Sequence, residues 1–259
     1  GGAVATVIGQ IIAAILALVF NLKCNRELNI SMKGFRPNGH LIVQIYKVGA
    51  PSIVVQAIGS LMTYGMNLIL AAFGSAQTVF GIYFKLQSFV FMPVFGLNNG
   101  MVPIIAYNYG AGHKDRVIKT IKHSVAYGVG IMFAGLLAMH IFPAQLMRMF
   151  DAEESLIAIG APALETISLS FVFAGFCIVA GSVFQALGNG VYSMIVSVAR
   201  QMCVLLPVAK LLSLSGEVTL IWWAFPIAEL ASVLLTSYFL VRIYRKVICH
   251  IGEPVVQDA

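Results

Sequence analysis

Long apolar runs restrict the fold of this chain more strongly than any single motif in it. They cover seven segments, at residues 1–22, 48–73, 79–107, 121–147, 160–187, 193–214 and 219–243. An α-helix needs about 20 predominantly apolar residues to cross the hydrocarbon core of a bilayer, and each run is of that order. A transmembrane β-barrel would instead show short segments of alternating hydrophobicity. The runs therefore predict an all-α integral membrane protein with seven transmembrane helices.

The composition agrees with that class and excludes several others. Of the 259 residues, 59% are hydrophobic and only 10% are charged, whereas a soluble domain carries about 25% charged residues. The net charge of +6 does not arise from one continuous basic patch, so we expect no nucleic acid partner. The expected partner is the lipid bilayer. The four cysteines form no CxxC or Cys/His cluster, which predicts neither a structural zinc site nor another bound cofactor.

Lysine and arginine are unevenly distributed among the gaps between the runs. The gaps 23–47 and 108–122 are basic, and Arg242, Arg245 and Lys246 lie at the C-terminal end of the last run, whereas the gaps 74–78, 148–159 and 213–219 are uncharged or net acidic. Only the short gap at 188–192 departs from the alternation, because it has no charge. Under the positive-inside rule, basic loops lie in the cytoplasm. We therefore expect a multi-pass protein of the cell membrane with a cytoplasmic linker at 23–47 and a cytoplasmic C-terminal tail at 244–259.

This orientation places the two ends of the chain and one aromatic cluster. The run 1–22 would be the last helix of an upstream part of the protein, because it starts without Met or a basic leader. The six runs within 48–243 would form one self-contained bundle. Trp222, Trp223 and Phe225 begin the last run, so they are expected in the outer aromatic belt of the membrane.

The third run is unusual because two prolines and two neighbouring amides interrupt it. Pro93, Pro103 and the pair Asn98 and Asn99 lie within it, and a Gly-Ala-Gly turn ends it at Gly112. Backbone groups freed by proline in lipid must be satisfied by neighbouring helices, side chains or water. The pattern predicts a broken helix that faces protein or a wet cavity.

Four ionisable residues lie inside apolar runs, where a charge costs at least about 2.5–3.5 kcal/mol to insert. They are Lys85, Glu165, Arg200 and Glu229. A rise of about 1.5 Å per residue places Lys85 and Glu165 at similar depth, and likewise Arg200 and Glu229. We predict these two ion pairs and consider all four residues for coupling ion movement to transport. For the first pair, snorkelling of the charges outward is an equally simple interpretation.

Uncharged side chains near the proline breaks are the candidates for contact with a substrate. We expect Gln56, Asn98 and Asn99 to line a cavity, together with Met62 and Met92, since methionine faces adapt to varied ligands. The plainer alternative is interhelical hydrogen bonding for the amides, and core or lipid contact for the methionines.

Several segments resemble the multidrug and toxic compound extrusion (MATE) family. The resemblance is strongest at GLNNG (96–100) and PIIAYNYGAG (103–112), which are similar to the eighth helix of that family and its following loop. It extends to the whole chain through GAVATVIGQ (2–10), VGAPS (48–52) and FQALGNG (184–190). These segments are similar to the sixth helix, the start of the seventh and the inner end of the tenth, in the family's order.

The resemblance implies a two-lobed, twelve-helix transporter that exports organic, often cationic amphipathic compounds in exchange for Na⁺ or H⁺. The chain would then hold the last helix of the N-terminal lobe (1–22), the inter-lobe linker (23–47) and the six-helix C-terminal lobe (48–243). Its partners would be a small-molecule substrate and the missing N-terminal lobe. Acidic residues that some sodium-coupled members carry would fall near Gly59 and Phe173, neither of which is acidic, so the coupling ion stays open.

Two other functions remain as alternatives to efflux. A flippase for lipid-linked oligosaccharide or peptidoglycan precursors would use several cavity cations to hold pyrophosphate, and only Lys85 and Arg200 are embedded here. A membrane-embedded enzyme is the more remote alternative, because the sequence has no HExxH, no GxSxG and no ATP-binding P-loop. We therefore expect a transporter and not an enzyme.

Overall fold

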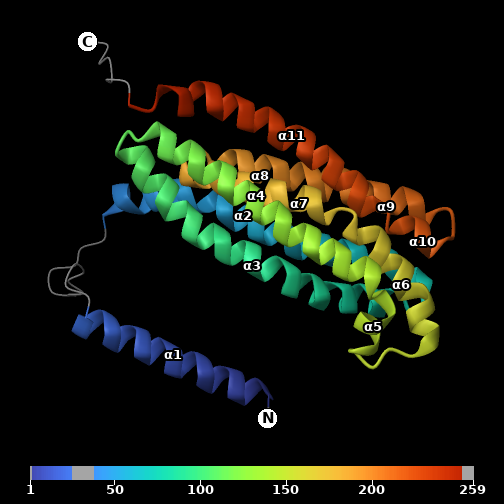
Figure 1. The fold of residues 1–259 in the computed structure, drawn as a ribbon. Helices are drawn as coiled ribbons and strands as arrows, with labels where there is room; N and C mark the ends of the chain where they lie inside the picture. Colours follow the sequence, from blue (N-terminus) through green and yellow to red (C-terminus); the bar gives the residue numbers. More distant parts are fainter. Residues whose placement is uncertain (1, 25–37, 253–259) are drawn as a thin grey trace. The chain divides into compact units, whose positions relative to one another are not determined.

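The computed structural model describes residues 2–24 and 38–252, and within these ranges it consists of helices and short connections, without strands (Figure 1). The chain divides into two compact units, Gly1–Ile45 and Tyr46–Ala259. Six helices are long and apolar enough to cross a membrane, and a bent helix pair is a candidate for a seventh span. The predicted all-α membrane fold is confirmed.

The first unit contains α1 (Gly2–Cys24), an apolar helix that carries no charged residue before Lys23. Part of the predicted linker, at 25–37, lies outside the described residues. The next helix, α2 (Gly39–Leu70), begins within that linker and before the predicted start at residue 48. The candidate membrane span that includes most of this helix nevertheless begins at Gly49 and ends at Phe73, in agreement with the predicted run at 48–73.

The second unit continues with α2 and the remaining helices of the chain. In chain order these are η1 (Ala71–Phe73), α3 (Ala76–Gly110), α4 (Lys114–Ile141), α5 (Pro143–Arg148), α6 (Glu154–Ser168), α7 (Phe171–Ala186), α8 (Gly190–Val198), η2 (Ala199–Leu205), α9 (Leu206–Ser213), α10 (Val218–Ile221), α11 (Ala224–Lys246) and η3 (Ile248–His250). The predicted span at 121–147 is divided, because the short helix α5 follows the end of α4 at Ile141.

The helix α3 is continuous, contrary to the predicted break. It includes both Pro93 and Pro103 and ends at Gly110. Each proline removes one backbone donor but leaves the preceding and following turns able to bond. The prediction overestimated this local effect, since proline is tolerated in a membrane helix when its neighbours satisfy the freed backbone groups.

The predicted span at 160–187 is instead a pair of helices, α6 and α7, bent by 48°. Two serine hydroxyls lie at the break: Ser168 Oγ donates to the Glu165 carbonyl at 3.0 Å, and Ser170 Oγ donates to the Ile167 carbonyl at 2.6 Å. Side-chain bonds of this kind offer the backbone an alternative to the helical ladder. They satisfy carbonyls at the point where α6 ends.

Close backbone packing holds α4 against α7. A Cβ added to Gly175 would lie 3.0 Å from the Gly128 carbonyl oxygen, so only glycine fits there without a shift. Small residues allow helices in membranes to approach closely. Because α3 packs against both α4 and α7, these three helices form one closely packed cluster within the bundle (Figure 1).

An aromatic core fills the end of the unit where α3 and α11 begin. The ring centroids of Phe80 and Trp222 lie 6.4 Å apart, and those of Tyr83 and Phe225 lie 5.8 Å apart. These four side chains are buried. Of the three aromatic residues predicted to form the outer belt, Trp223 alone is exposed. The predicted outer belt is therefore wrong for Trp222 and Phe225, which pack inside the helices.

The opposite end of the unit is fastened by contacts between the α3–α4 turn and the segment after α11. Lys114 Nζ donates to the Cys249 carbonyl at 2.8 Å. Gly112 and Gly252 both have positive φ, and a Cβ on Gly252 would lie 3.0 Å from the Gly112 carbonyl oxygen. Glycine is required here both for the left-handed conformation and for the close approach.

Candidate functional site

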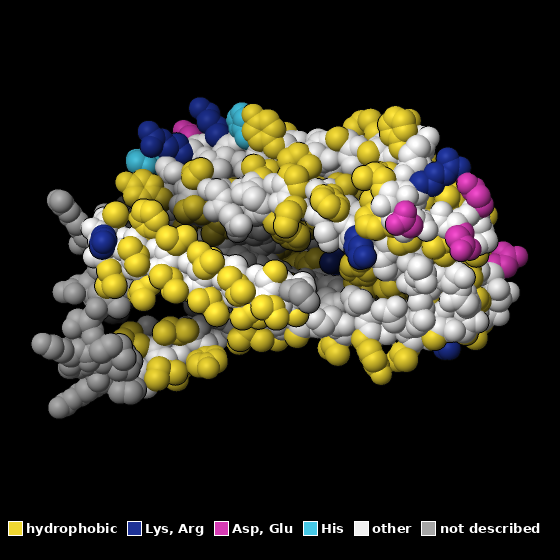
Figure 2. All heavy atoms as spheres, turned by 90° about the horizontal axis from the view of Figure 1, so that it is seen from below, with side chains coloured by type: hydrophobic (Ala, Val, Ile, Leu, Met, Phe, Trp, Pro, Cys, Tyr) yellow, Lys and Arg dark blue, Asp and Glu magenta, His cyan; other side chains and the backbone are white. Residues whose placement is uncertain are grey.

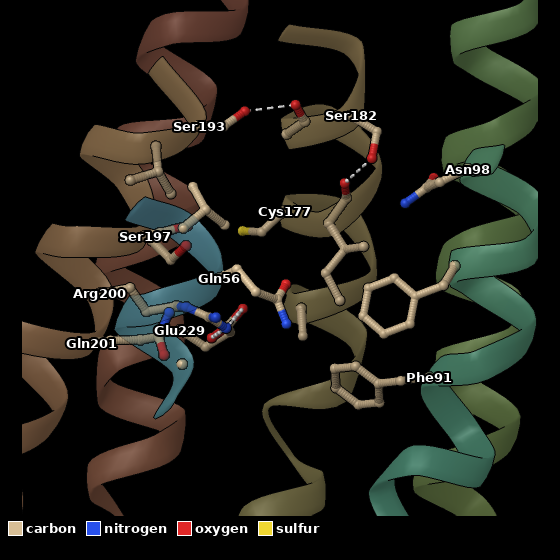
Figure 3. Close-up of a pocket in the computed structure, with 18 of the residues that line it drawn as sticks. Gln56, Phe91, Asn98, Cys177, Ser182, Ser193, Ser197, Arg200, Gln201 and Glu229 are labelled. Carbon is tan, nitrogen blue, oxygen red and sulfur yellow. Dashed lines mark hydrogen bonds and ion pairs between the residues drawn. The ribbon is translucent and has the colours of Figure 1, made fainter. Parts of the chain in front are cut away.

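A cavity of about 960 Å³ opens within the second unit. It is lined by residues of α2, α3, α7, α8, η2 and α11 (Figure 3). Apolar side chains such as Phe84 and Phe91 share the lining with amides and hydroxyls. A concave site with an apolar body and a few polar groups is the usual form of a small-molecule site.

The helix α2 approaches its neighbours on both sides of its cavity-lining segment. A Cβ added to Gly190 would lie 3.7 Å from Pro51 Cβ. Further along, a Cβ added to Gly65 would lie 2.8 Å from the Leu206 side chain. Between these contacts, Gln56 and other residues of α2 line the cavity. The middle of α2 therefore forms one wall of the site.

Arg200 and Glu229 form an ion pair at this cavity. Arg200 Nη1 lies 3.1 Å from Glu229 Oε2 and 3.4 Å from Oε1. The Glu229 side chain is 6% exposed and that of Arg200 is 29% exposed. Both residues line the cavity. The predicted pairing of these two residues is therefore confirmed, while their role in transport stays a prediction.

A π-helical turn carries Arg200. The segment η2 is a π-helix, and the backbone N–H of Leu206 donates to the Gln201 carbonyl, five residues earlier. Pro207 follows directly and has no N–H to continue an α-helical ladder. Such π segments in helices are frequent at functional sites. Nothing in the spacing of apolar residues indicated this turn.

The sequence analysis selected Glu229 but missed two hydroxyl residues that lie with it in one polar stripe on α11. Glu229, Ser232 and Thr236 are buried and line the cavity. The hydroxyls of Ser232 and Thr236 have no hydrogen-bond partner among the described residues. Their spacing of i, i+3 and i+7 from Glu229 puts the three on one helix face. This helical spacing was the feature of the sequence that could have predicted the polar stripe.

The cavity brings together four of the five residues expected to contact substrate. Gln56, Met62, Asn98 and Asn99 line it, and Asn98 Oδ1 is buried without a partner among the described residues. Met92 is 72% exposed and is not part of the lining. Gln201, which is not one of these five residues, also lines the cavity and is 5% exposed.

The predicted pair of Lys85 with Glu165 is wrong. Both side chains are exposed, and no ion pair joins them within the described part of the chain. Lys85 Nζ lies 5.6 Å from the centroid of the Phe150 ring, in a cation–π arrangement. Neither residue lines the cavity, so the structure does not bring them to the site.

The helices, the cavity and the ion pair together indicate a class of protein. An all-helical, multi-span unit with a polar cavity and one buried ion pair has the architecture of a membrane transporter lobe. The MatE family model matches residues 51–211. Because that match covers more than half of the chain, the protein belongs to the MATE family of multidrug efflux transporters.

Curated relatives are multidrug exporters. The chain is 25% identical over 248 residues to the multidrug export protein MepA of Staphylococcus haemolyticus, covering 95% of this chain and 54% of that protein. It is 27% identical over 231 residues to MepA of Staphylococcus aureus strain MSSA476, covering 88% and 51%. The chain thus spans about half the length of the curated relatives it matches.

Solved structures share the fold. The MATE multidrug transporter DinF-BH, determined as a complex, superposes with a TM-score of 0.83 at 32% identity, over 94% of this chain and 55% of that one. A MOP superfamily transporter from Pyrococcus furiosus superposes with a TM-score of 0.81 at 19% identity, over the same shares of the two chains. At that lower identity the likeness concerns the fold alone.

Proposed function

We propose that this chain works in the secondary-active efflux of organic, cationic amphipathic compounds. The observation that carries the proposal is the cavity of about 960 Å³, lined by both aromatic and polar side chains, in a member of the MATE family. Aromatic and methionine faces suit varied greasy ligands. Of the residues selected from the sequence, Gln56, Met62, Asn98 and Asn99 are proposed to contact the substrate.

In this proposal the second unit acts with a partner lobe. Residues 48–243 would form the C-terminal lobe, 1–22 would be the last helix of an N-terminal lobe, and 23–47 would link them. The coverage of about half of each relative is compatible with this arrangement. Rocking of two such lobes about a central site gives alternating access.

The charge distribution supports a cytoplasmic C-terminus in the cell membrane. Acidic side chains gather at the α5–α6 end of the second unit in Figure 2. The segment from the end of α5 to the start of α6 contains Asp151, Glu153 and Glu154. The N-terminal end of α4, by contrast, contains Lys114 and Arg116. Under the positive-inside rule the start of α4 would face the cytoplasm. The segment that follows α11 contacts the start of α4, because Lys114 donates to the Cys249 carbonyl.

MATE transporters are ion-coupled, and we propose Glu229 as the residue of this chain that links Na⁺ or H⁺ movement to transport. It is a buried carboxylate on the cavity wall. Intramembrane ionisable groups at such positions commonly mark ion pathways. Comparing substrate-driven dissipation of a Na⁺ gradient and of a pH gradient in proteoliposomes of the full-length protein distinguishes the two ions.

An efflux assay tests the proposal. The full-length protein is expressed in a host without its own drug pumps, and ethidium and norfloxacin accumulation are followed by fluorescence. We expect at least a several-fold decrease in accumulation of one or both compounds, abolished when the Na⁺ and H⁺ gradients are both collapsed. Unchanged accumulation of both at verified membrane expression would refute drug efflux. The flippase alternative is less favoured, because Arg200 is the single basic residue among the described residues of the lining.

A further inference from the structure

Arg200 uses only part of its hydrogen-bonding capacity on Glu229. A guanidinium has five N–H donors on three nitrogens. Within the described part of the chain, the side-chain hydrogen bonds of Arg200 are its two contacts to Glu229, and Nη1 makes both of them. The paired carboxylate is nearly enclosed, whereas the arginine side chain is 29% exposed. The guanidinium therefore presents unused donors at the cavity.

The charge of the lining restricts what these donors can hold. Arg200 and Glu229 are the two charged residues among those of the described chain that line the cavity, so the part of the lining that this chain supplies has a net charge of zero. A purely cationic ligand could form an ion pair with Glu229 only by displacing Arg200 from that carboxylate. A pyrophosphate would bring several negative charges to one guanidinium that is already neutralised. A ligand that carries one carboxylate and one cationic group leaves the balance unchanged.

Neighbouring amides extend the same subsite. Gln201 follows Arg200 in η2, and Gln56 faces it from α2; the side chains of all three point into the cavity in Figure 3. Amide N–H groups are further donors for a carboxylate. On the other side of the cavity, Phe91 supplies an apolar surface for the body of a ligand. Polar and apolar surfaces are thus separated within one site.

We propose that Arg200 forms a carboxylate-binding subsite, through which the cavity selects zwitterionic amphipathic compounds. The guanidinium holds the carboxylate by Nη2 and Nε while Nη1 stays on Glu229. Planar guanidinium donors match carboxylate oxygens two at a time. This inference rests on the proposed efflux function and narrows its substrate class from cations to compounds that also carry a carboxylate.

The test compares two ligands that differ only in the carboxylate. Norfloxacin is a zwitterion, and its ethyl ester keeps the ring and the amine but not the negative charge. Their binding to the purified full-length protein is measured by fluorescence anisotropy. We expect the wild-type protein to bind the acid about tenfold or more tightly than the ester, as for hydrogen bonds to a charged group.

Three variants separate the subsite from general damage. Arg200→Gln combined with Glu229→Gln removes both charges together and avoids a buried unpaired carboxylate; we expect the acid-to-ester preference to fall to about one. Arg200→Lys keeps the ion pair but loses the planar fork, so the preference should decrease about threefold or more. Arg242→Gln changes an exposed arginine of α11 outside the lining and should retain the preference.

The results separate this inference from the proposed function. Equal binding of acid and ester by the wild-type protein, or a preference that survives in the double variant, would overturn the carboxylate subsite. Binding of neither compound by a protein that exports ethidium would also overturn it. Conversely, a preference that depends on Arg200 supports the subsite even if ethidium efflux fails, and only the efflux proposal is then lost.

Discussion

Two sets of intramembrane charges in this protein have opposite surroundings. Arg200 and Glu229 are paired at 3.1 Å on the wall of the cavity. Lys85 and Glu165 are exposed, and Lys85 contacts the Phe150 ring instead. The sequence analysis predicted an ion pair for each set from the same estimate, the depth of each residue in the membrane. The difference teaches that depth along a span is not sufficient, because the direction of each side chain decides whether two charges meet.

The buried and exposed faces of α3 explain this failure and a second one. Ile82 and Leu86 are buried, whereas Lys85, Phe89 and Met92 are exposed. The exposed residues are separated by four and three positions, so they form one stripe along the helix. A single unknown rotation of α3 therefore misplaced both Lys85 as an ion-pair partner and Met92 as a cavity residue.

The largest expected effect comes from removing one partner of the buried pair. Glu229→Leu leaves Arg200 without its carboxylate, and we expect a loss of about 3–5 kcal/mol in the free energy of unfolding. Glu165→Leu, at an exposed site, should stay within about 0.5 kcal/mol. Denaturant titration of the purified full-length protein measures both. Similar losses for the two variants would remove the contrast between the regions.

Replacing both partners together should recover most of that loss. Arg200→Met combined with Glu229→Leu removes both buried charges, and such replacements are often neutral or stabilising. We expect unfolding free energy within about 1 kcal/mol of the wild type, together with lost efflux. The double-mutant cycle with the two single variants gives the coupling energy. A double variant as unstable as Glu229→Leu would show that packing, rather than charge, holds this region.

A milder change isolates function from stability. Glu229→Gln keeps the shape of the side chain and a carbonyl acceptor for Arg200, but it removes the charge. We expect drug efflux to decrease about tenfold, a change of about 1.4 kcal/mol, with normal membrane insertion. Glu165→Gln is the matched control and should leave efflux unchanged. Full drug resistance in cells that express Glu229→Gln at the normal level would exclude a transport role for this carboxylate.

The smallest effect is expected at the exposed region. Lys85→Met loses the cation–π contact with Phe150 but keeps most of the apolar stem, so stability should fall by about 0.5–1 kcal/mol. Phe150→Leu should cost a similar amount from the other side of the contact. Thermal unfolding with drug efflux as a second measurement checks the pair. An efflux defect in Lys85→Met would mean that this lysine belongs to the transport machinery after all.

The sequence was most reliable where many residues carry one signal. The apolar runs located the spans because each involves about 20 residues, and a few errors at the ends do not matter. The family resemblance at 96–112 is likewise a long, ordered pattern. Pairing of Arg200 with Glu229 was also predicted, since few opposite charges are available inside the spans. These features needed no knowledge of how the helices are rotated.

Features that depend on one or two backbone bonds were not predicted. The Ser168 and Ser170 hydroxyls bond backbone carbonyls at the bend between α6 and α7, but serine is common in unbent membrane helices as well. The π-helix before Pro207 depends on which carbonyl the Leu206 N–H selects. In α3 the opposite error arose, because two prolines suggested a break that the surrounding helix does not allow.

The contact between Gly112 and Gly252 gives the end of α11 a mechanical role. It joins two backbones rather than two flexible side chains, and the Lys114 bond to the Cys249 carbonyl reinforces it. The last helix and the α3–α4 hairpin are therefore fixed to each other at this end of the unit. A probe attached to Cys249 would follow the movement of α3, and so would report on the helix that carries Asn98 and Asn99 into the cavity.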